Sequence, residues 1–415
     1  MLNEYFSSIA SILRKSRAPA PSWKQYLVAQ GAIRGLVAGV DRLGKGLVAW
    51  DNDGELWSAR INASRILALA KYPLGEGHSP TLSVDGCGKG MLVWLSGPAG
   101  REEVMAATVN PGGEIDDSHF CLSTSGPVQH LQVAVDRRGG AIALWLQEGA
   151  SGWEVRVQTH DGRKGTWEKE STRLGLPDPI PTRPHLIMNR QGLAMAIWQV
   201  REGDFEGPVV AYNWPHERIW SDRLVRISDH ITTELTACLD NQGNALACWV
   251  HRRHGEQALL EASFYSANAC EWSAPRRLAS APGLFQLRMG MDPVGDSLLT
   301  WRQKENAGND HLLGKACHEG EWQENALRTP AGPEYLSDYA LMKRGAETTL
   351  LLLPVRGGAV IHRMRAAGWD SPVYLAPDLE EIGAHPLLLS HSAGMTALWL
   401  SGSVGHVRLM SASEA

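Results

Sequence analysis

The chain has 415 residues, of which 43% are hydrophobic and 20% are charged, and its formal net charge is −5. This length exceeds what one hydrophobic core usually organises, so it favours several domains or an array of repeats. The balanced charge excludes the basic footprint expected of a nucleic-acid-binding protein.

Residues 1–20 are predicted to form a separate element, a short amphipathic helix followed by a linker. Apolar side chains recur there at helical spacing, and basic residues at positions 14, 15 and 17 occupy the last turn, where they suit the helix dipole. The helix is expected to pack on the rest of the protein, to dock on a partner or to lie on a membrane surface. The candidate docking residues are Tyr5, Phe6, Ile9, Ile12 and Leu13.

A hairpin motif first appears at residues 39–50 and recurs along the chain, with successive anchors 44 to 53 residues apart. Its centre is Asp-x-x-Gly between two short apolar runs. Asp bonds nearby backbone groups in a turn and Gly supplies positive φ, so the pattern predicts a β-hairpin. The copies end at Trp50, Trp94, Trp145, Trp198, Trp249, Trp301 and Trp399, and a degraded copy ends near Leu351.

Each hairpin is followed by a third apolar run, such as residues 259–265, and by a fourth that begins with tryptophan, such as Trp272. Four strands in a repeat of about 50 residues are typical of a propeller blade. Eight hairpins therefore predict an all-β protein in which residues 21–415 form an eight-bladed β-propeller of four-stranded blades. A seven-bladed ring is the alternative.

The two ends of the array predict how the ring closes. Residues 21–27 have a fourth-strand sequence with its tryptophan, Trp23, yet they precede the first hairpin. The chain ends after a third strand at residues 406–410. We therefore expect the N-terminal strand to complete the last blade, which would remove the exposed sheet edges that invite aggregation.

Histidines gather where the repeat places one face of the propeller. In a propeller, the loops that lead into the innermost strands share a face with the loops joining second to third strands. Histidine binds metals and transfers protons near neutral pH, so this rim is the candidate functional surface. Polar residues also collect in loops for purely structural reasons. The candidate binding residues are His78, His130, His185, His230, His251, His254 and His385.

Other chemistry is sparse. Arg183 and Arg288 lie near inner-strand positions, where a guanidinium could hold a carboxylate through two hydrogen bonds. No three histidines have the local spacing of a zinc site, so no metal ligands are predicted. No catalytic constellation stands out either, and catalytic residues are therefore predicted as none.

The motif Asp-x-x-Gly-x-Ala-φ-Ala-φ-Trp resembles the repeats of bacterial sialidase-like and lectin-like β-propellers over about residues 22–410. The resemblance implies the fold. Sialidases carry Ser-x-Asp-x-Gly-x-Thr-Trp boxes and an arginine triad, which this chain lacks, so the resemblance does not extend to their activity. Quinoprotein propellers hold their cofactor beside adjacent cysteines, which are absent here, and no cofactor is expected.

These observations favour a non-catalytic binding or scaffold propeller that recognises a protein or glycan partner through its rim. The alternative is a hydrolase or lyase with its site at the mouth of the central channel. We expect a cytoplasmic protein, because the six cysteines are scattered without a CxxC pair and no apolar run approaches membrane-spanning length. The identity of the partner and the oligomeric state are left open.

Overall fold

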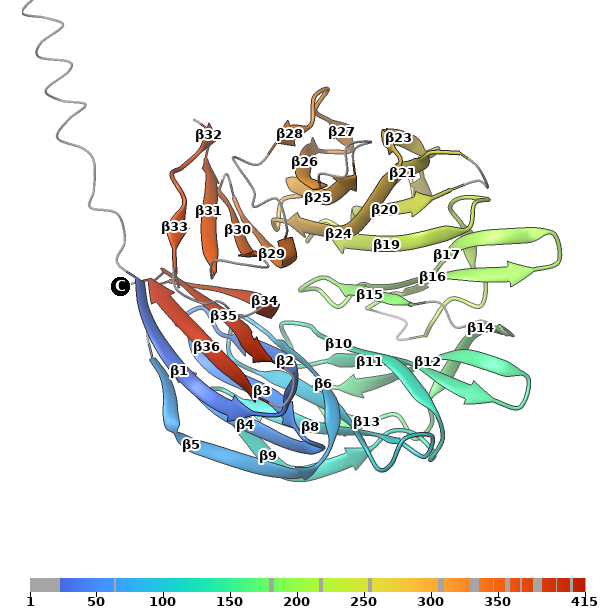
Figure 1. Ribbon diagram of the computed structural model, residues 1–415. Coiled ribbons are helices and arrows are strands. Elements are labelled where there is room, and N and C mark those ends of the chain that lie inside the picture. The colour runs from blue at the N-terminus through green and yellow to red at the C-terminus, as the bar shows by residue number, and fades with distance from the viewer. Residues whose placement is uncertain are drawn as a thin grey trace, which may run out of the picture.

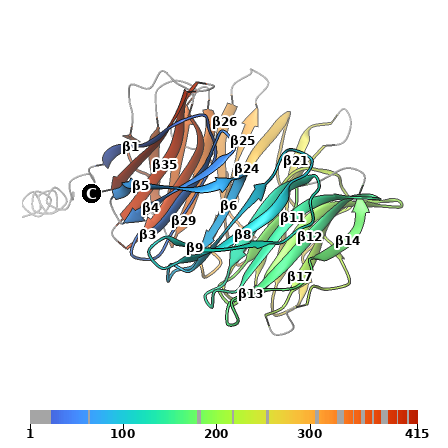
Figure 2. The same cartoon turned by 90° about the horizontal axis from the view of Figure 1, so that it is seen from below.

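The computed structural model describes residues 23–62, 65–178, 183–215, 219–252, 256–304, 310–328, 336–345, 347–354, 359–365, 368–375, 383–392, 394–403 and 406–414. In this part of the chain the strands form eight antiparallel sheets arranged as the blades of one ring (Figure 1). Figure 2 shows the same sheets after a quarter turn. The eight-bladed prediction is confirmed, and the seven-bladed alternative is wrong. No helix of the described residues is long and apolar enough to cross a membrane. The predicted N-terminal helix lies outside the described residues.

The first four blades follow one another along the chain. Blade 1 contains β2 (Ile33–Val40), β3 (Lys45–Asn52), β4 (Glu55–Asn62) and β5 (Arg65–Glu76). Blade 2 contains β6 (His78–Val84), β7 (Gly90–Ser96), β8 (Glu103–Asn110) and β9 (Glu114–Cys121). Blade 3 contains β10 (Val128–Val135), β11 (Ala141–Gly149), β12 (Gly152–Asp161), β13 (Thr166–Trp167) and β14 (Thr172–Asp178). Blade 4 contains β15 (His185–Met188), β16 (Ala194–Glu202), β17 (Phe205–Asn213) and β18 (Val225–Arg226).

The remaining blades complete the ring, and in four of the eight the outermost strand is split into two segments that pair with the same third strand. Blade 5 contains β19 (Thr232–Leu239), β20 (Ala245–His251), β21 (Ala258–Ser266), β22 (Glu271–Trp272) and β23 (Arg276–Ala281). Blade 6 contains β24 (Gly283–Met291), β25 (Ser297–Lys304), β26 (Asp310–His318), β27 (Glu321–Trp322) and β28 (Leu327–Arg328). Blade 7 contains β29 (Leu336–Arg344), β30 (Glu347–Pro354), β31 (Val360–Arg365), β32 (Gly368–Trp369) and β33 (Val373–Tyr374). Blade 8 contains β34 (Gly383–His391), β35 (Gly394–Ser403), β36 (His406–Glu414) and β1 (Trp23–Gly31).

The recurring aspartate holds the turn between the first two strands of a blade. In blade 6, Oδ1 of the buried Asp292 accepts hydrogen bonds from the backbone N–H groups of Val294 and Asp296, both at 3.0 Å. Gly295 adopts the positive φ that the turn requires. An acceptor at this position satisfies two turn amides at once, which explains why Asp or Asn recurs there. The same pair of bonds is made by Asp41, Asp85, Asp136, Asn189 and Asp240.

The recurring tryptophan packs each blade against the preceding one. Trp249 of blade 5 is fully buried in a cluster with Ile197 and Val210 of blade 4. In five blades the strand opposite the tryptophan carries a bulge, as between Phe285 and Arg288 opposite Trp301. The large aromatic side chain at this repeated position of the second strand therefore supplies apolar contact between neighbouring sheets.

Blade 7 differs in its first turn. Arg344 pairs with Glu347, so the turn is shorter than the aspartate turns. A shift of one residue reverses which face of a strand a side chain occupies. As a result Leu350, not Leu351, packs with Tyr339 towards blade 6, whereas Leu351 belongs to the cluster shared with blade 8. The anchor expected near Leu351 is therefore displaced by one position.

The ring closes through the N-terminal strand, as predicted. β1 runs antiparallel to β36, from Trp23 opposite Glu414 to Gly31 opposite Val407. In Figure 1 the blue β1 lies beside the red strands of blade 8. Val28 is buried in a cluster that also contains side chains of blades 1 and 8. Residues from the two ends of the chain thus build one sheet.

Candidate functional site at the histidine-bearing rim

The innermost strands share a bulge that sets the position of two candidate histidines. His130 in β10 and His385 in β34 have φ values of 51° and 50°. Ser79, Gln286 and Gly35 adopt the same left-handed conformation at the bulges of β6, β24 and β2. The bulge faces the large tryptophan on the next strand. The left-handed backbone at His130 and His385 is therefore a feature of the repeated bulge. Any function particular to these two residues must come from their side chains.

Polar side chains tie adjacent innermost strands together next to these bulges. Glu234 in β19 accepts hydrogen bonds from the backbone N–H groups of Gln286 and Leu287 in β24, each at 2.8 Å. Gln132 in β10 likewise accepts a bond from the N–H of Leu186 in β15, at 2.9 Å, and donates to the carbonyl of Pro184. The residues beside Pro184 are thereby held close to β10.

Four basic side chains near or on three innermost strands lie close enough to influence one another's charge. His130 comes from β10, Arg183 and His185 flank Pro184 at the start of β15, and Arg288 comes from β24. Nη2 of Arg288 lies 3.6 Å from Oδ1 of Asp338. No ion pair joins Arg183 to any described residue, and its side chain is exposed. We call His130, Arg183, His185 and Arg288 the axial basic cluster. It unites four positions, two histidines and two arginines, that the sequence singled out separately.

Burial and the neighbouring positive charges favour the neutral form of both imidazoles in the axial basic cluster. Burial, reinforced by the positive charges of Arg183 and Arg288, lowers the pKa of His185 to about 4. Burial and the guanidinium of Arg183 also lower the pKa of His130. An anion placed among these groups would favour the imidazolium form and raise both pKa values. The cluster is thus better suited to bind an anion than to act as a general base through a histidine of ordinary pKa.

The lowered pKa of His185 predicts a loss of stability in acid. Its folded-state pKa lies below the unfolded value near 6.5, so the unfolded chain binds more protons between these values. The free energy of unfolding should fall as the pH decreases from about 6.5 to 4, by up to about 3 kcal/mol from this group. Urea denaturation of the wild type and His185→Gln across this range measures the effect. Identical pH profiles would contradict the prediction.

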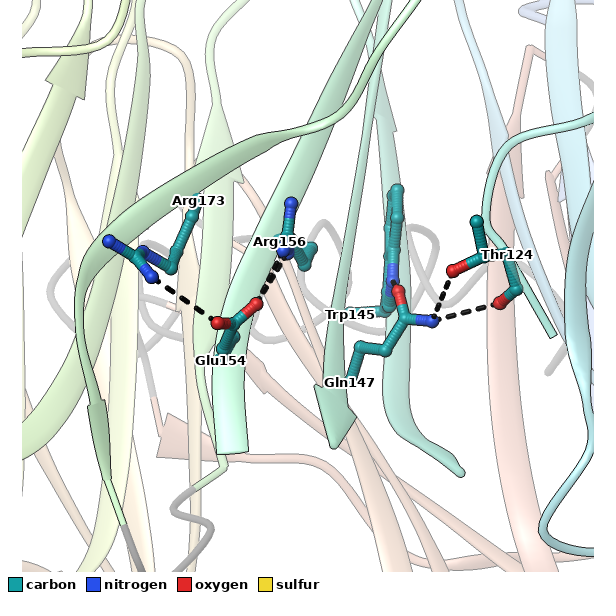
Figure 3. Close-up of polar contacts among 6 residues, drawn as sticks. All are labelled: Thr124, Trp145, Gln147, Glu154, Arg156 and Arg173. Carbon is teal, nitrogen blue, oxygen red and sulfur yellow. Dashed lines mark hydrogen bonds and ion pairs between the residues drawn. The ribbon is translucent and has the colours of Figure 1, made fainter. Parts of the chain in front are cut away.

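In blades 3 and 6 a glutamine lies two residues beyond the hairpin tryptophan and bonds its indole. In blade 3 the indole Nε1 of Trp145 donates to Oε1 of Gln147 at 3.2 Å, and Nε2 of Gln147 donates to the carbonyl of Thr124 at 2.8 Å (Figure 3). Thr124 belongs to the link that leads into this blade. Trp301 donates to Gln303 in the same manner in blade 6, at 3.3 Å. The glutamine therefore fastens the link between blades to the tryptophan.

In blade 3 a charged residue lies opposite the hairpin tryptophan on the third strand. Arg156 is directly opposite Trp145 and forms an ion pair with Glu154, whose other oxygen is 3.3 Å from Nη1 of Arg173 (Figure 3). Glu154 is buried and bridges two arginines. All three side chains belong to one blade, and the carboxylate is held by both guanidinium groups, so we regard this group as structural.

In blade 5 the corresponding positions hold a different set of side chains. His251 stands two residues after Trp249, and Glu261 is directly opposite that tryptophan. Nε2 of the buried His251 lies 3.1 Å from Oε2 of Glu261. The ring of His230, from the link into this blade, stacks on His251 with centroids 4.3 Å apart and 21° between the planes. The sequence identified the two histidines but missed Glu261, which an alignment of the third strands would have placed opposite the tryptophan.

The other rim histidines that the structure describes, His78 and His385, do not join either group. His78 bonds the neighbouring Ser79 through Nδ1 at 3.2 Å, and the side chain of His385 is exposed. His254 lies outside the described residues. A cavity of about 360 Å³ lies between blades 3 and 4 near His160 and Trp167, away from the predicted histidines.

Comparison with solved structures supports the fold and no more. The polysaccharide lyase Uly1 has a TM-score of 0.51 and 12% identity, covering 79% of this chain and 88% of the lyase. The β-propeller domain of the Trilobed protease from Pyrococcus furiosus has a TM-score of 0.49 and 8% identity, with coverages of 81% and 94%. The Hadza microbial sialidase Hz136 has a TM-score of 0.39 and 12% identity, with coverages of 94% and 93%.

No protein-family model matches the sequence, and no curated protein matches it at a significant level. The expected resemblance is therefore supported only as a shared β-propeller fold, without a family assignment.

Proposed function

We propose that the protein is a non-catalytic binding propeller whose rim recognises a carboxylate group on a protein or glycan partner. The axial basic cluster carries this proposal, because two arginines and two histidines from three blades influence one another's charge there. Guanidinium groups bind carboxylates through paired hydrogen bonds, and they do so best where few other anions compete.

The carboxylates near the cluster are bonded elsewhere and do not pair with Arg183. Glu234 already accepts two backbone hydrogen bonds, and Asp338 pairs with Arg288 and accepts the N–H of Tyr339. Arg183 is exposed and makes no ion pair within the described part of the chain. A carboxylate that reached Arg183 would also lie near His130 and His185. The cluster therefore supports recognition of an anion by direct contact.

A hydrolase or lyase at the channel mouth is the alternative. General acid–base catalysis works best when a catalytic group has a pKa near the operating pH. The two imidazoles of the axial basic cluster have lowered pKa values, to about 4 for His185. This property favours binding over proton transfer at neutral pH.

Titration with carboxylate-bearing probes tests the proposal. An oligoglutamate peptide and a uronic-acid oligosaccharide represent the two kinds of partner, and oligolysine and a neutral oligosaccharide serve as controls. Calorimetry should detect binding of at least one acidic probe and of neither control. Arg183→Gln should weaken that binding about tenfold, the usual loss for one charge-assisted contact.

Two comparisons make the test specific. Arg137→Gln removes a charge from the turn at the other end of β10 and should leave the affinity unchanged. Since a bound carboxylate raises the pKa of His130 and His185, protons are taken up on binding, and the affinity should increase as the pH falls from 7.5 to 5.5. Equal binding of acidic and neutral probes, or an affinity that Arg183→Gln leaves intact, would overturn the proposal.

A further inference from the structure

The histidine pair of blade 5 forms a compact group with an acid. One candidate ligand atom from each of His230, His251 and Glu261 lies within 4.8 Å of the others. It is the single such group of three in the part of the chain that the structure describes. His251 is 3% exposed and the side chain of Glu261 is 15% exposed, so two of the three groups are largely shielded from water.

The repeat shows that the fold does not require these residue types. The position of His251 is occupied in other blades by Asn52, Ser96, Gln147, Val200, Gln303 and Ser401. The position of Glu261 is occupied by Trp57, Met105, Arg156, Val209, Leu313 and Met410. Blade 5 alone among the hairpins that end in tryptophan combines a histidine with a carboxylate at this place. Both departures from the repeat occur in one blade and face each other.

We propose that His230, His251 and Glu261 bind a zinc ion at the junction of blades 4 and 5. Two imidazoles and one carboxylate are a ligand set that zinc accepts, with a fourth position left for water or another ligand. In a tetrahedral site, bonds of 2.0–2.1 Å place neighbouring ligand atoms about 3.3 Å apart. The 3.1 Å between His251 Nε2 and Glu261 Oε2 is close to this separation.

The surroundings of His230 are compatible with its role as the third zinc ligand. Its Nδ1 lies 3.2 Å from Oγ of the buried Ser228, so we assign Nε2 as the metal-binding nitrogen. A partner on the second ring nitrogen is the usual way in which a ligating histidine is oriented. The stacked ring of His230 must tilt away from His251 to direct its lone pair at a shared metal. His230 is only half-buried and lies in the link before β19, so it is the ligand best placed to move.

The site is independent of the axial basic cluster, because it uses none of that cluster's residues. Zinc attracts carboxylates as well as imidazoles, but the metal-binding test requires no organic ligand. Failure of carboxylate binding at Arg183 would therefore leave the zinc proposal standing, and the reverse also holds.

Metal titration of the full chain, purified without a histidine tag and stripped with a chelator, tests the proposal. After incubation with zinc and desalting, elemental analysis should find one zinc ion per chain. His251→Gln places the residue of blades 3 and 6 at this position and should reduce zinc affinity at least about 100-fold. Glu261→Leu, which copies Leu313 of blade 6, is a second variant chosen to preserve folding. His78→Gln removes a partly exposed rim histidine outside this group and should leave binding unchanged.

Two further readouts separate a built site from surface binding. Zinc should raise the melting temperature of the wild type and of His78→Gln but not of the two ligand variants, since a ligand that binds only the folded state stabilises it. Cobalt should give the visible absorption of a four-coordinate site in the wild type, whether or not any variant folds. The absence of retained zinc in the wild type, or equal retention in wild type and His251→Gln, would overturn the proposal.

Discussion

Deletion of residues 23–31 is expected to prevent the propeller from folding. β36 would lose its partner along the whole length from Glu414 to Val407 and expose a row of unpaired backbone groups. The cluster between blades 1 and 8 would lose the buried side chains of Val28 and Ala29. We expect an insoluble or unfolded product, measured by circular dichroism and size-exclusion chromatography. A deletion of residues 1–18 keeps every described strand and should fold.

A circular permutant distinguishes the role of β1 from a general sensitivity to truncation. Trp23 lies opposite Glu414, so a short hairpin loop can join the end of β36 directly to the start of β1. The new termini would fall at Ala32, between β1 and β2. This protein contains the same strands in one continuous blade 8 and should fold. If the deletion variant folds as well as the permutant, closure by β1 is not needed for stability.

Asp292→Ala is expected to lower the free energy of unfolding by about 3 kcal/mol, because two backbone amides lose a charged acceptor. The carboxylate is 4% exposed, and its Oδ1 bonds the N–H groups of Val294 and Asp296. Pro293 in the same turn also accepts the N–H of Asn241 from blade 5, at 3.3 Å. A disturbed turn would therefore weaken contact with the neighbouring blade. Urea denaturation monitored by tryptophan fluorescence measures the loss.

Asp292→Asn is the matched control for this prediction. Asn189 makes the equivalent two bonds in blade 4, at 3.0 and 3.1 Å, so an amide oxygen can replace the carboxylate. We expect this variant to stay within about 1 kcal/mol of the wild type. If both substitutions destabilise the protein equally, the charge of Asp292 matters more than its acceptor geometry.

The hairpin repeat is predictable from sequence because its determinants are local. Asp292 bonds amides two and four residues away, and Gly295 sets the turn between them. These interactions lie within one short segment, so residue type and spacing suffice to identify them. Blade 7 shows the limit of this reasoning: the degraded copy was located only approximately, near Leu351, and the shortened turn places its anchor at Leu350.

The candidate sites depend on contacts between segments far apart in the chain. His130 and Arg288 belong to blades 3 and 6, yet both influence His185. Glu261 lies close to His251 because β21 pairs with β20, and His230 reaches the same place from the link between blades. No fixed spacing marks such groups, since each depends on the register of strands and on the link between blades.

The sequence by itself determined the number of blades, the turn chemistry and the closing strand. The turns follow from hydrogen bonds between residues close in sequence. The closing strand follows from Trp23, a fourth-strand tryptophan that stands before the first hairpin. Only the tertiary structure decided which rim residues meet. Among the histidines predicted for one face, His130 and His185 adjoin two arginines, and His230 and His251 adjoin Glu261. The physical reason is that bringing blades together sets distances between side chains that the spacing within a repeat does not specify.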